Sequence, residues 1–298
     1  MGHRLTSAIA LVFIVATTAA CGGPNQPAET PAPPAEPEST GAAQATEQVA
    51  EPAVVAAELN PDRPTVLITG TNRGIGLEFV RQFAERDYNV IATARKPEAA
   101  EELNALAADH DNVVVEQLDV TDHARIEALA AAYADQPIDI LLSNAAITPR
   151  YKTAFQRVKG IDFEMARQSF EVNALAPLKL AQAFMSSVAA SDQKKIIMMS
   201  SKAGSFAEGP KMPMMYSYRG SKAALDMYMY ILSFETTKKG ITTVLLSPGS
   251  VNTTPGMKLP NAIEPEESVA KMIEVIDGLT PENNGQFLNY EDGRLIGW

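Results

Sequence analysis

Hydrophobic positions in residues 64–298 follow two patterns that alternate along the chain. Short runs of consecutive apolar and β-branched residues, such as 65–69, are typical of strands buried on both faces of a parallel sheet. The stretches between them repeat apolar residues every three or four positions, as helices with one buried face do. Strands are predicted at 65–69, 89–94, 113–117, 138–143, 195–199, 242–246 and 285–288. This alternation predicts an α/β fold, a single domain with a doubly wound parallel sheet of about seven strands and helices on both faces.

A glycine-rich turn ends the first predicted strand, and a helical pattern follows at 77–86. The turn reads Gly70-Thr71-Asn72-Arg73-Gly74-Ile75-Gly76. A strand, a glycine-rich turn and a helix form the dinucleotide-binding corner of Rossmann-type sheets, because the backbone can approach a pyrophosphate and the helix N-terminus offers free amides. The spacing is Gly-x-x-x-Gly-x-Gly rather than Gly-x-Gly-x-x-Gly, so a purely structural turn remains the alternative.

The second predicted strand ends in basic residues. An acidic residue there would bind ribose hydroxyls and favour NAD, but the sequence reads Ala94-Arg95-Lys96. Arg95 and Arg73 together could hold a 2′-phosphate, because guanidinium groups match phosphate geometry. We therefore expect NADP as the cofactor, with NAD also possible. Solvated surface arginines are the alternative interpretation.

Polar and small residues also follow later strands, at the edge where such sheets bind ligands. Asp119 could reach an adenine amino group or serve only in its own loop, and Asn144 and Ala145 would permit close packing beside a cofactor. Asn173 lies four residues before Pro177, which cannot donate a hydrogen bond to its carbonyl group. A free carbonyl at a local bend can hold a water molecule, so Asn173 is a candidate for a proton path.

Tyr218 and Lys222 are one helical turn apart, on one face of the helix predicted to run to about residue 239. A lysine ammonium beside a phenol stabilises the phenolate and would lower the pKa of Tyr218 from its reference of about 10. Such a phenol is a proton donor that works near neutral pH. The residue four positions after Tyr216 is Gly220, so of these two tyrosines only Tyr218 has a lysine one turn later. The alternative is a surface pair at helical spacing.

Composition excludes several kinds of function. The net charge is −11, and residues 22–62 contain seven acidic residues with no Lys or Arg. No basic patch is present, so nucleic-acid binding is not expected. One cysteine, Cys21, and three scattered histidines do not form a ligand pattern, so no metal site is expected either.

Residues 1–21 have a basic start and an apolar run at 8–20, which are typical of a secretory signal. The end, Thr18-Ala19-Ala20-Cys21, resembles the lipobox of bacterial lipoproteins, in which Leu is usual where Thr18 stands. This predicts a bacterial lipoprotein anchored at Cys21 on the periplasmic side of the cell envelope. A cleaved signal peptide and an uncleaved anchor are the alternatives, and the protein would be cytoplasmic if the leader is not functional. Residues 22–63, rich in Pro, Ala and Glu, are predicted to be a disordered linker.

Taken together, the motifs of residues 64–298 resemble the short-chain dehydrogenase/reductase family, with the sniffer and C-factor-like carbonyl reductases as the nearest subgroup. Besides the glycine turn, the correspondence rests on Asp119-Val120, Asn144-Ala145, Asn173, Ser201, Tyr218-x-x-x-Lys222 and Pro248-Gly249-x-Val251-x-Thr253. Two departures are Ala146, where the family usually has Gly, and a long segment between Ser201 and Tyr218.

The resemblance implies a role for each matching residue. Tyr218 would protonate the substrate carbonyl oxygen, and Ser201 would hydrogen-bond the same oxygen. Lys222 would lower the pKa of Tyr218 and bind the nicotinamide ribose, while Asn173 would hold the water that replaces the proton. The implied cofactor-binding residues are Gly70, Asn72, Arg73, Gly74, Ile75, Gly76, Arg95, Asp119, Val120, Asn144, Ala145, Tyr218, Lys222, Pro248, Gly249, Val251 and Thr253.

The implied activity is NADP(H)-dependent hydride transfer between nicotinamide and a small carbonyl or alcohol substrate, such as an aldehyde or ketone. The alternative is an NAD(P)-binding signalling or sensor protein with incidental turnover. Relatives also lead us to expect a homodimer or tetramer, and a membrane contact only through the acylated N-terminus.

Overall fold

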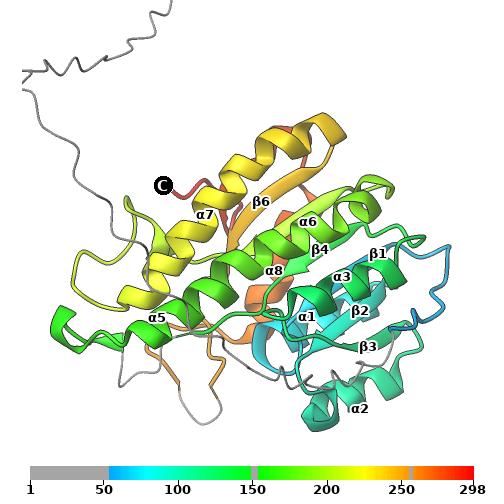
Figure 1. The fold of residues 1–298 in the computed structure, drawn as a ribbon, viewed down its shortest axis with the longest axis horizontal. Coiled ribbons are helices and arrows are strands. Elements are labelled where there is room, and N and C mark those ends of the chain that lie inside the picture. The colour runs from blue at the N-terminus through cyan, green and yellow to red at the C-terminus, as the bar shows by residue number, and fades with distance from the viewer. Residues whose placement is uncertain (1–53, 149–153, 255–257) are drawn as a thin grey trace, which may run out of the picture. The chain divides into compact units, whose positions relative to one another are not determined.

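The computed structural model describes residues 54–148, 154–254 and 258–298, and it confirms the predicted doubly wound, Rossmann-type sheet. Seven strands pair in parallel in the order β3-β2-β1-β4-β5-β6-β7 (Figure 1). The strands are β1 Thr65–Thr69, β2 Asn89–Ala94, β3 Val113–Gln117, β4 Ile140–Ser143, β5 Lys195–Met199, β6 Thr242–Ser247 and β7 Phe287–Asn289. The predicted signal segment and its Cys21 lie outside the described residues.

Helices connect the strands. They are α1 Gly74–Glu85, α2 Glu101–Asp109, α3 His123–Ala132, α5 Phe163–Phe170, α6 Ala176–Ala189, α7 Tyr216–Thr236 and α8 Pro265–Asp277. The bend predicted before Pro177 is present: a π-helical turn, Glu171–Leu175, joins α5 to α6. The turn ends two residues before Pro177, whose missing N–H interrupts the regular hydrogen-bond ladder.

All strands except β3 contribute side chains to two cores, because successive strand residues point to opposite faces of the sheet. Leu67 and Leu141 lie in the core with α3, α6 and α7, whereas Val66 and Ile68 lie in the core with α1, α2 and α8. All four side chains are fully buried. Burial on both faces explains why these strands are continuous apolar runs.

The strand order reverses at β1. The chain moves outward from β1 through β2 to β3, and then β4 returns to pair with the other side of β1. The segments that follow β1 and β4 therefore leave the sheet in opposite directions, which opens a crevice at the carboxyl ends of these strands. The predicted site residues that follow β1, β4, β5 and β6 all belong to this edge.

Residues 54–63, predicted to belong to the linker, lie against the domain instead. Val54, Ala56 and Leu59 pack on the core that α3 helps to form. The Ala57 N–H donates to the hydroxyl of Tyr133, at 3.2 Å. These apolar contacts hold the segment against the domain together with polar ones, although its composition resembles that of the residues before it. The described part of the domain thus begins at residue 54 rather than 64.

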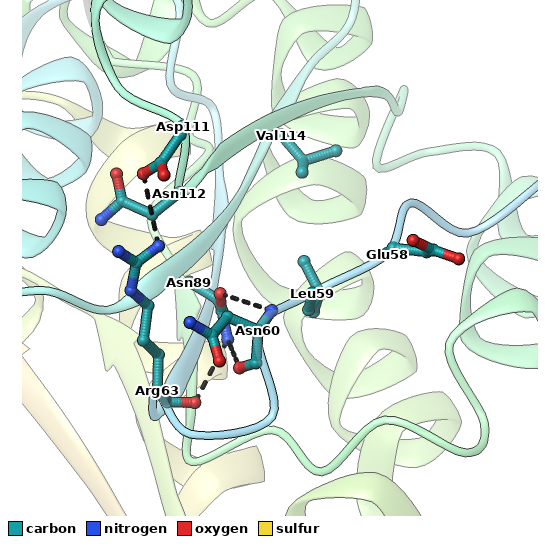
Figure 2. Close-up of a pocket in the computed structure, with 8 residues that line it drawn as sticks. All are labelled: Glu58, Leu59, Asn60, Arg63, Asn89, Asp111, Asn112 and Val114. Atoms are coloured by element: carbon teal, nitrogen blue, oxygen red, sulfur yellow. Dashed lines mark hydrogen bonds and ion pairs between the residues drawn. The ribbon is translucent and has the colours of Figure 1, made fainter.

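A polar hollow of about 330 Å³ lies between this segment and the amino ends of β2 and β3 (Figure 2). Arg63 spans it with ion pairs to Asp87, at 2.7 Å, and to Asp111, at 3.3 Å. The Asn89 amide donates to the carbonyl groups of Asn60, at 2.8 Å, and Arg63, at 3.1 Å. Its polar groups fasten the segment to the sheet, at the edge opposite the crevice.

Two further observations concern the part of the chain that the structure describes. No helix in it is long and apolar enough to cross a membrane. No group of three or more His, Cys, Asp or Glu side chains in it is arranged to hold a metal ion.

Candidate active site

The glycine turn after β1 is packed so tightly that it leaves no room for a side chain at Gly70 or Gly76. Gly70 and Gly74 have left-handed backbone, with φ values of 71° and 58°, which favour glycine. A Cβ atom on Gly76 would lie 2.1 Å from the Gly70 carbonyl oxygen. The turn leads into α1 at Gly74, so the amide groups of the first turn of the helix lie beside it. These features fit a pyrophosphate-binding corner.

Asn144 braces this turn from the end of β4. Its amide nitrogen donates to the carbonyl oxygens of Thr69 and Gly70, each at 3.0 Å. The Thr69 hydroxyl in turn accepts from the N–H groups of Asn144 and Ala145, both at 3.1 Å. A Cβ on Gly70 would lie 2.7 Å from the Ala145 Cα. The structure thus brings Asn144 and Ala145 against the turn, and the side chain of Asn144 shapes it.

The residues predicted to bind the adenosine end of the cofactor differ in their exposure and contacts. Asn72, Arg73 and Arg95 are exposed. Arg73 also donates to the Thr253 carbonyl oxygen, at 3.1 Å. Of the two interpretations of Asp119, the structure supports a loop role, because its Oδ1 accepts from the N–H and hydroxyl of Thr121.

The segment after β6 folds back onto the glycine turn. Gly249 has a φ of 80°, and a Cβ there would lie 2.5 Å from the Tyr290 ring. Val251 pairs with Ile263 in an isolated bridge. Thr253 lies so close to Gly74 that a Cβ on this glycine would be 3.3 Å from the Thr253 side chain.

The remaining predicted cofactor residues lie within these segments. They are Ile75, which packs against the α1 side of the sheet, Val120, which is buried after β3, and Pro248, whose carbonyl oxygen accepts from the Ser268 hydroxyl at 2.7 Å. The segments after β1, β3, β4 and β6 therefore carry the predicted cofactor residues to one edge of the sheet. Ala146, the departure from the family pattern, is exposed.

Helix α7 presents Tyr218 and Lys222 to the end of β5 and the residues after it. The Ser201 hydroxyl lies beside the Tyr218 phenol and lowers its pKa. One turn later, the Lys222 ammonium donates to the Met199 carbonyl oxygen, at 2.7 Å. Gly204 is needed for this approach, because a Cβ there would lie 2.9 Å from the Lys222 Cβ.

The pKa of Tyr218 is raised, whereas the sequence predicted that Lys222 would lower it. Burial is the largest cause, the hydrogen bond with Ser201 opposes it, and the negative charge of Asp226 adds to it. Burial also lowers the pKa of Lys222, to about 8, against the opposing field of Asp226. Burial outweighs the other causes at Tyr218, and the Lys222 ammonium donates to the Met199 carbonyl rather than to the phenol.

Asn173 lies in the π-helical turn and is fully buried. Its Oδ1 accepts from the Ile147 N–H at 2.8 Å, and its Nδ2 donates to the Ile147 carbonyl and the Ser221 hydroxyl, each at 3.0 Å. The side chain therefore links the segment after β4 to α7, next to Lys222. Its predicted role in holding a water through the main chain stays a prediction.

Two residues of this cluster were not predicted from the sequence. Ser200 and Asp226 are buried, and the Ser200 hydroxyl donates to the Asp226 Oδ1. Asp226 lies four residues after Lys222, which is the same helical spacing that pointed to Lys222 from Tyr218. This four-residue spacing is the sequence signal that could have identified Asp226.

The segment between Ser201 and α7 is held from both sides. Arg219 of α7 donates to the Ala203 carbonyl, at 2.9 Å. Glu208 pairs with Arg294 of the C-terminal segment, at 3.1 Å, and accepts from the Gly297 N–H, at 3.0 Å. The segment nevertheless leaves apolar side chains exposed, Phe206 at 81% and Met212 at 53%.

Known proteins are similar to this chain in sequence and in fold. A family model described as short chain dehydrogenase matches residues 64–263. The NADPH-bound carbonyl reductase from chicken fatty liver is 34% identical, with a TM-score of 0.73, and the carbonyl reductase Sniffer of D. melanogaster is 29% identical, with a TM-score of 0.72. Each comparison covers 79% of this chain and 100% of the other. The C-signal protein of Myxococcus xanthus is 33% identical over 174 residues, 58% of this chain and 100% of that protein. The predicted similarity to these groups is confirmed.

Proposed function

Because the chain belongs to the short-chain dehydrogenase family, we propose that it is an NADP(H)-dependent oxidoreductase that reduces the carbonyl group of an aldehyde or ketone. One observation carries this proposal. Tyr218, Ser201 and Lys222 meet at the carboxyl end of β5, at the same edge of the sheet as the glycine turn after β1.

The residues present fit the cofactor. The glycine turn leaves backbone rather than side chains for the pyrophosphate, and the exposed Arg73 and Arg95 can pair with a 2′-phosphate. The NADPH-bound neighbour supports this choice over NAD. When bound, NADPH supplies the hydride for the carbonyl carbon.

Side chains of the protein supply the proton and bind the carbonyl oxygen. Tyr218 donates its phenolic proton to the carbonyl oxygen as negative charge develops there, and Ser201 holds the same oxygen by a hydrogen bond. A raised pKa keeps the phenol of Tyr218 protonated at neutral pH, which suits the direction of reduction. Lys222 is buried beside them and holds the end of β5 in place.

A Tyr218→Phe variant tests this assignment. We expect it to bind NADPH as the wild type does and to lose carbonyl reduction by about 10²–10⁴-fold, the usual contribution of a general acid. Fluorescence titration with NADPH and steady-state reduction of an aldehyde and ketone panel are the measurements. Full activity in this variant would refute the assignment, and Tyr216→Phe is the matched control, because the residue four positions after Tyr216 is Gly220 and not a lysine.

The exposed apolar side chains between Ser201 and α7 favour an apolar substrate of medium size. Phe206 and Met212 lie in this segment, and Tyr216 begins α7. Rates for a series of alkyl and aryl aldehydes should rise with apolar area. Preference for small, charged carbonyls would contradict this.

A signalling or sensor function is the second candidate, and the similarity to the C-signal protein favours it. Binding alone does not need a buried phenol paired with a serine and a lysine. Tight NADPH binding without turnover across the carbonyl panel would favour the sensor.

We also propose that the protein is a homodimer, or a tetramer, through α5 and α7. These helices pack side by side and leave apolar side chains exposed, Phe163 and Met165 on α5 and Met227, Ile231 and Phe234 on α7. Light scattering after size exclusion should give a multiple of 32.0 kDa, and Ile231→Asp should reduce it to one copy. A monomeric wild type would contradict this.

The predicted anchor at Cys21 leads us to propose a place in the bacterial cell envelope. Two facts oppose this placement. NADPH is a cytoplasmic compound, and the leader has no twin-arginine signal for exporting a folded protein. Fractionation of cells expressing the full chain, with and without an inhibitor of lipoprotein processing, tests this. A Cys21→Ser variant that stays in the membrane fraction would contradict the acylated anchor.

A further inference from the structure

Helix α7 continues its functional face one turn beyond Lys222, to Asp226. Tyr218, Lys222 and Asp226 follow one another at four-residue intervals and meet the last residues of β5 and the residues after it. Tyr218 meets Ser201, Lys222 donates to the Met199 carbonyl, and Asp226 accepts from the Ser200 hydroxyl. Three successive positions, 199 to 201, are thus held by three successive turns of one helix.

Asp226 is an unusual residue for this place. It is 4% exposed, and Lys222 is 3% exposed. A buried carboxylate is costly unless it is paired. An asparagine would accept the same bond from Ser200 without introducing a charge. The hydrogen bond alone therefore does not explain the acid.

The charge of Asp226 has two titratable neighbours among the described residues, both on α7. Its field opposes the loss of a proton from Lys222 and from Tyr218. From β5, its contact is the neutral hydroxyl of Ser200. No other charged group on the elements packed around it contributes at Asp226 in the described part of the chain.

We propose that Asp226 is a positioning residue that serves the active site in two ways: through Ser200 it fixes the strand end that carries Ser201, and through its charge it keeps Lys222 and Tyr218 protonated. This rests on the proposed function for its link to turnover. Burial raises the pKa of Asp226 to about 7, so this control acts near neutral pH.

Removing the charge should shift the ionisation of Tyr218. In Asp226→Asn, the negative charge that opposes phenolate formation is gone, so Tyr218 should lose its proton at a lower pH. Asp226 is the smallest of the three causes that shift the pKa of Tyr218, so the expected change is a shift to lower pH that leaves burial as the dominant cause. The alkaline limb of the pH profile for carbonyl reduction should move to lower pH by the same amount.

Ser200→Ala provides the matched control. It removes the hydrogen bond but leaves the carboxylate, so the pH profile should keep its position while kcat falls through the displaced Ser201. An unshifted profile in Asp226→Asn, or the same shift in Ser200→Ala, would overturn the charge role. An unchanged kcat in Ser200→Ala would overturn the role in fixing Ser201.

A measurement without substrate separates this proposal from the proposed function. Carbon-13 tyrosine NMR, with Tyr218→Phe to identify the resonance, follows the ionisation of Tyr218 in the protein itself. The resonance should titrate at lower pH in Asp226→Asn than in the wild type. If that variant does not fold, the same titration of the wild type is the test. If Tyr218 is coupled to Asp226, its resonance should show an inflection near pH 7, the pKa of Asp226. A resonance that stays flat there would refute the coupling, whatever the turnover.

Discussion

Gly76→Ala should destabilise the protein and weaken cofactor binding together, because Gly76 is the tightest point of the glycine turn. The added Cβ would lie 2.1 Å from the Gly70 carbonyl oxygen and 2.6 Å from the Asn144 amide nitrogen. Ordinary contacts begin near 3.4 Å. The backbone of the turn would therefore have to move by more than about 1 Å, as it does in overpacked sites.

The cost can be worked out from these contacts. Overpacking of this kind costs about 1–3 kcal/mol. Displacing Asn144 also endangers its bonds to Thr69 and Gly70, each worth about 1 kcal/mol. The better helix propensity of alanine returns at most about 1 kcal/mol. We therefore expect the free energy of unfolding to fall by about 2–4 kcal/mol, which lowers Tm by about 5–15 °C in a domain of this size.

Thermal and urea unfolding measure the stability, and fluorescence titration measures the affinity for NADPH. Gly220→Ala is the matched control, since no atom lies within 4 Å of a Cβ there and the residue is inside α7. It should raise stability by about 0.5–1 kcal/mol, as is usual for Gly in a helix. A Gly76→Ala protein with wild-type stability and wild-type NADPH affinity would refute the steric reasoning.

Three further predictions concern charge and the ends of the domain. Arg95→Gln should weaken NADPH binding by about tenfold, the loss of a charge-assisted bond, and leave NADH binding unchanged; equal losses for both would exclude contact with the 2′-phosphate. Because burial raises the pKa of Asp226 from 3.8 to about 7, the folded protein binds more protons than the unfolded chain between these values. The free energy of unfolding, measured in urea titrations, should therefore fall as pH rises from about 4 to 7. In Asp226→Asn it should fall less over the same range. Tyr133→Phe removes the hydroxyl that accepts from the Ala57 N–H, and protease digestion should then cut residues 54–63 faster than in the wild type.

The sequence was a good guide wherever neighbours along the chain decide the outcome. Each strand came from a local run of apolar residues, since burial on both faces leaves little room for polar positions in 65–69 or 195–199. The pairing of Tyr218 with Lys222 follows from helical spacing, and the exposure of Tyr216 agrees with the choice between the two phenols. The glycine turn followed from its spacing and the strand before it.

Errors came where a residue's partner is distant in sequence. The segment 54–63 was assigned to the linker because its composition resembles that of the linker, yet Ala57 meets Tyr133. The hydrogen bonds of Asn144 to Thr69 and Gly70 were not foreseen for the same reason, although its predicted place beside the cofactor stays a prediction. The local bend predicted before Pro177 is confirmed, but its form, a π-helical turn with Asn173 bonded to Ile147, was not predicted.

The sequence by itself determined the strands, the order of the motifs and which helical face carries Tyr218 and Lys222, because local periodicity and spacing encode these. Only the tertiary structure decided which way the Lys222 ammonium points, what raises the pKa of Tyr218, and that Ser200 and Asp226 belong to the same cluster. These depend on how α7 lies over the end of β5, since hydrogen bonds and fields act over distances in space and not along the chain.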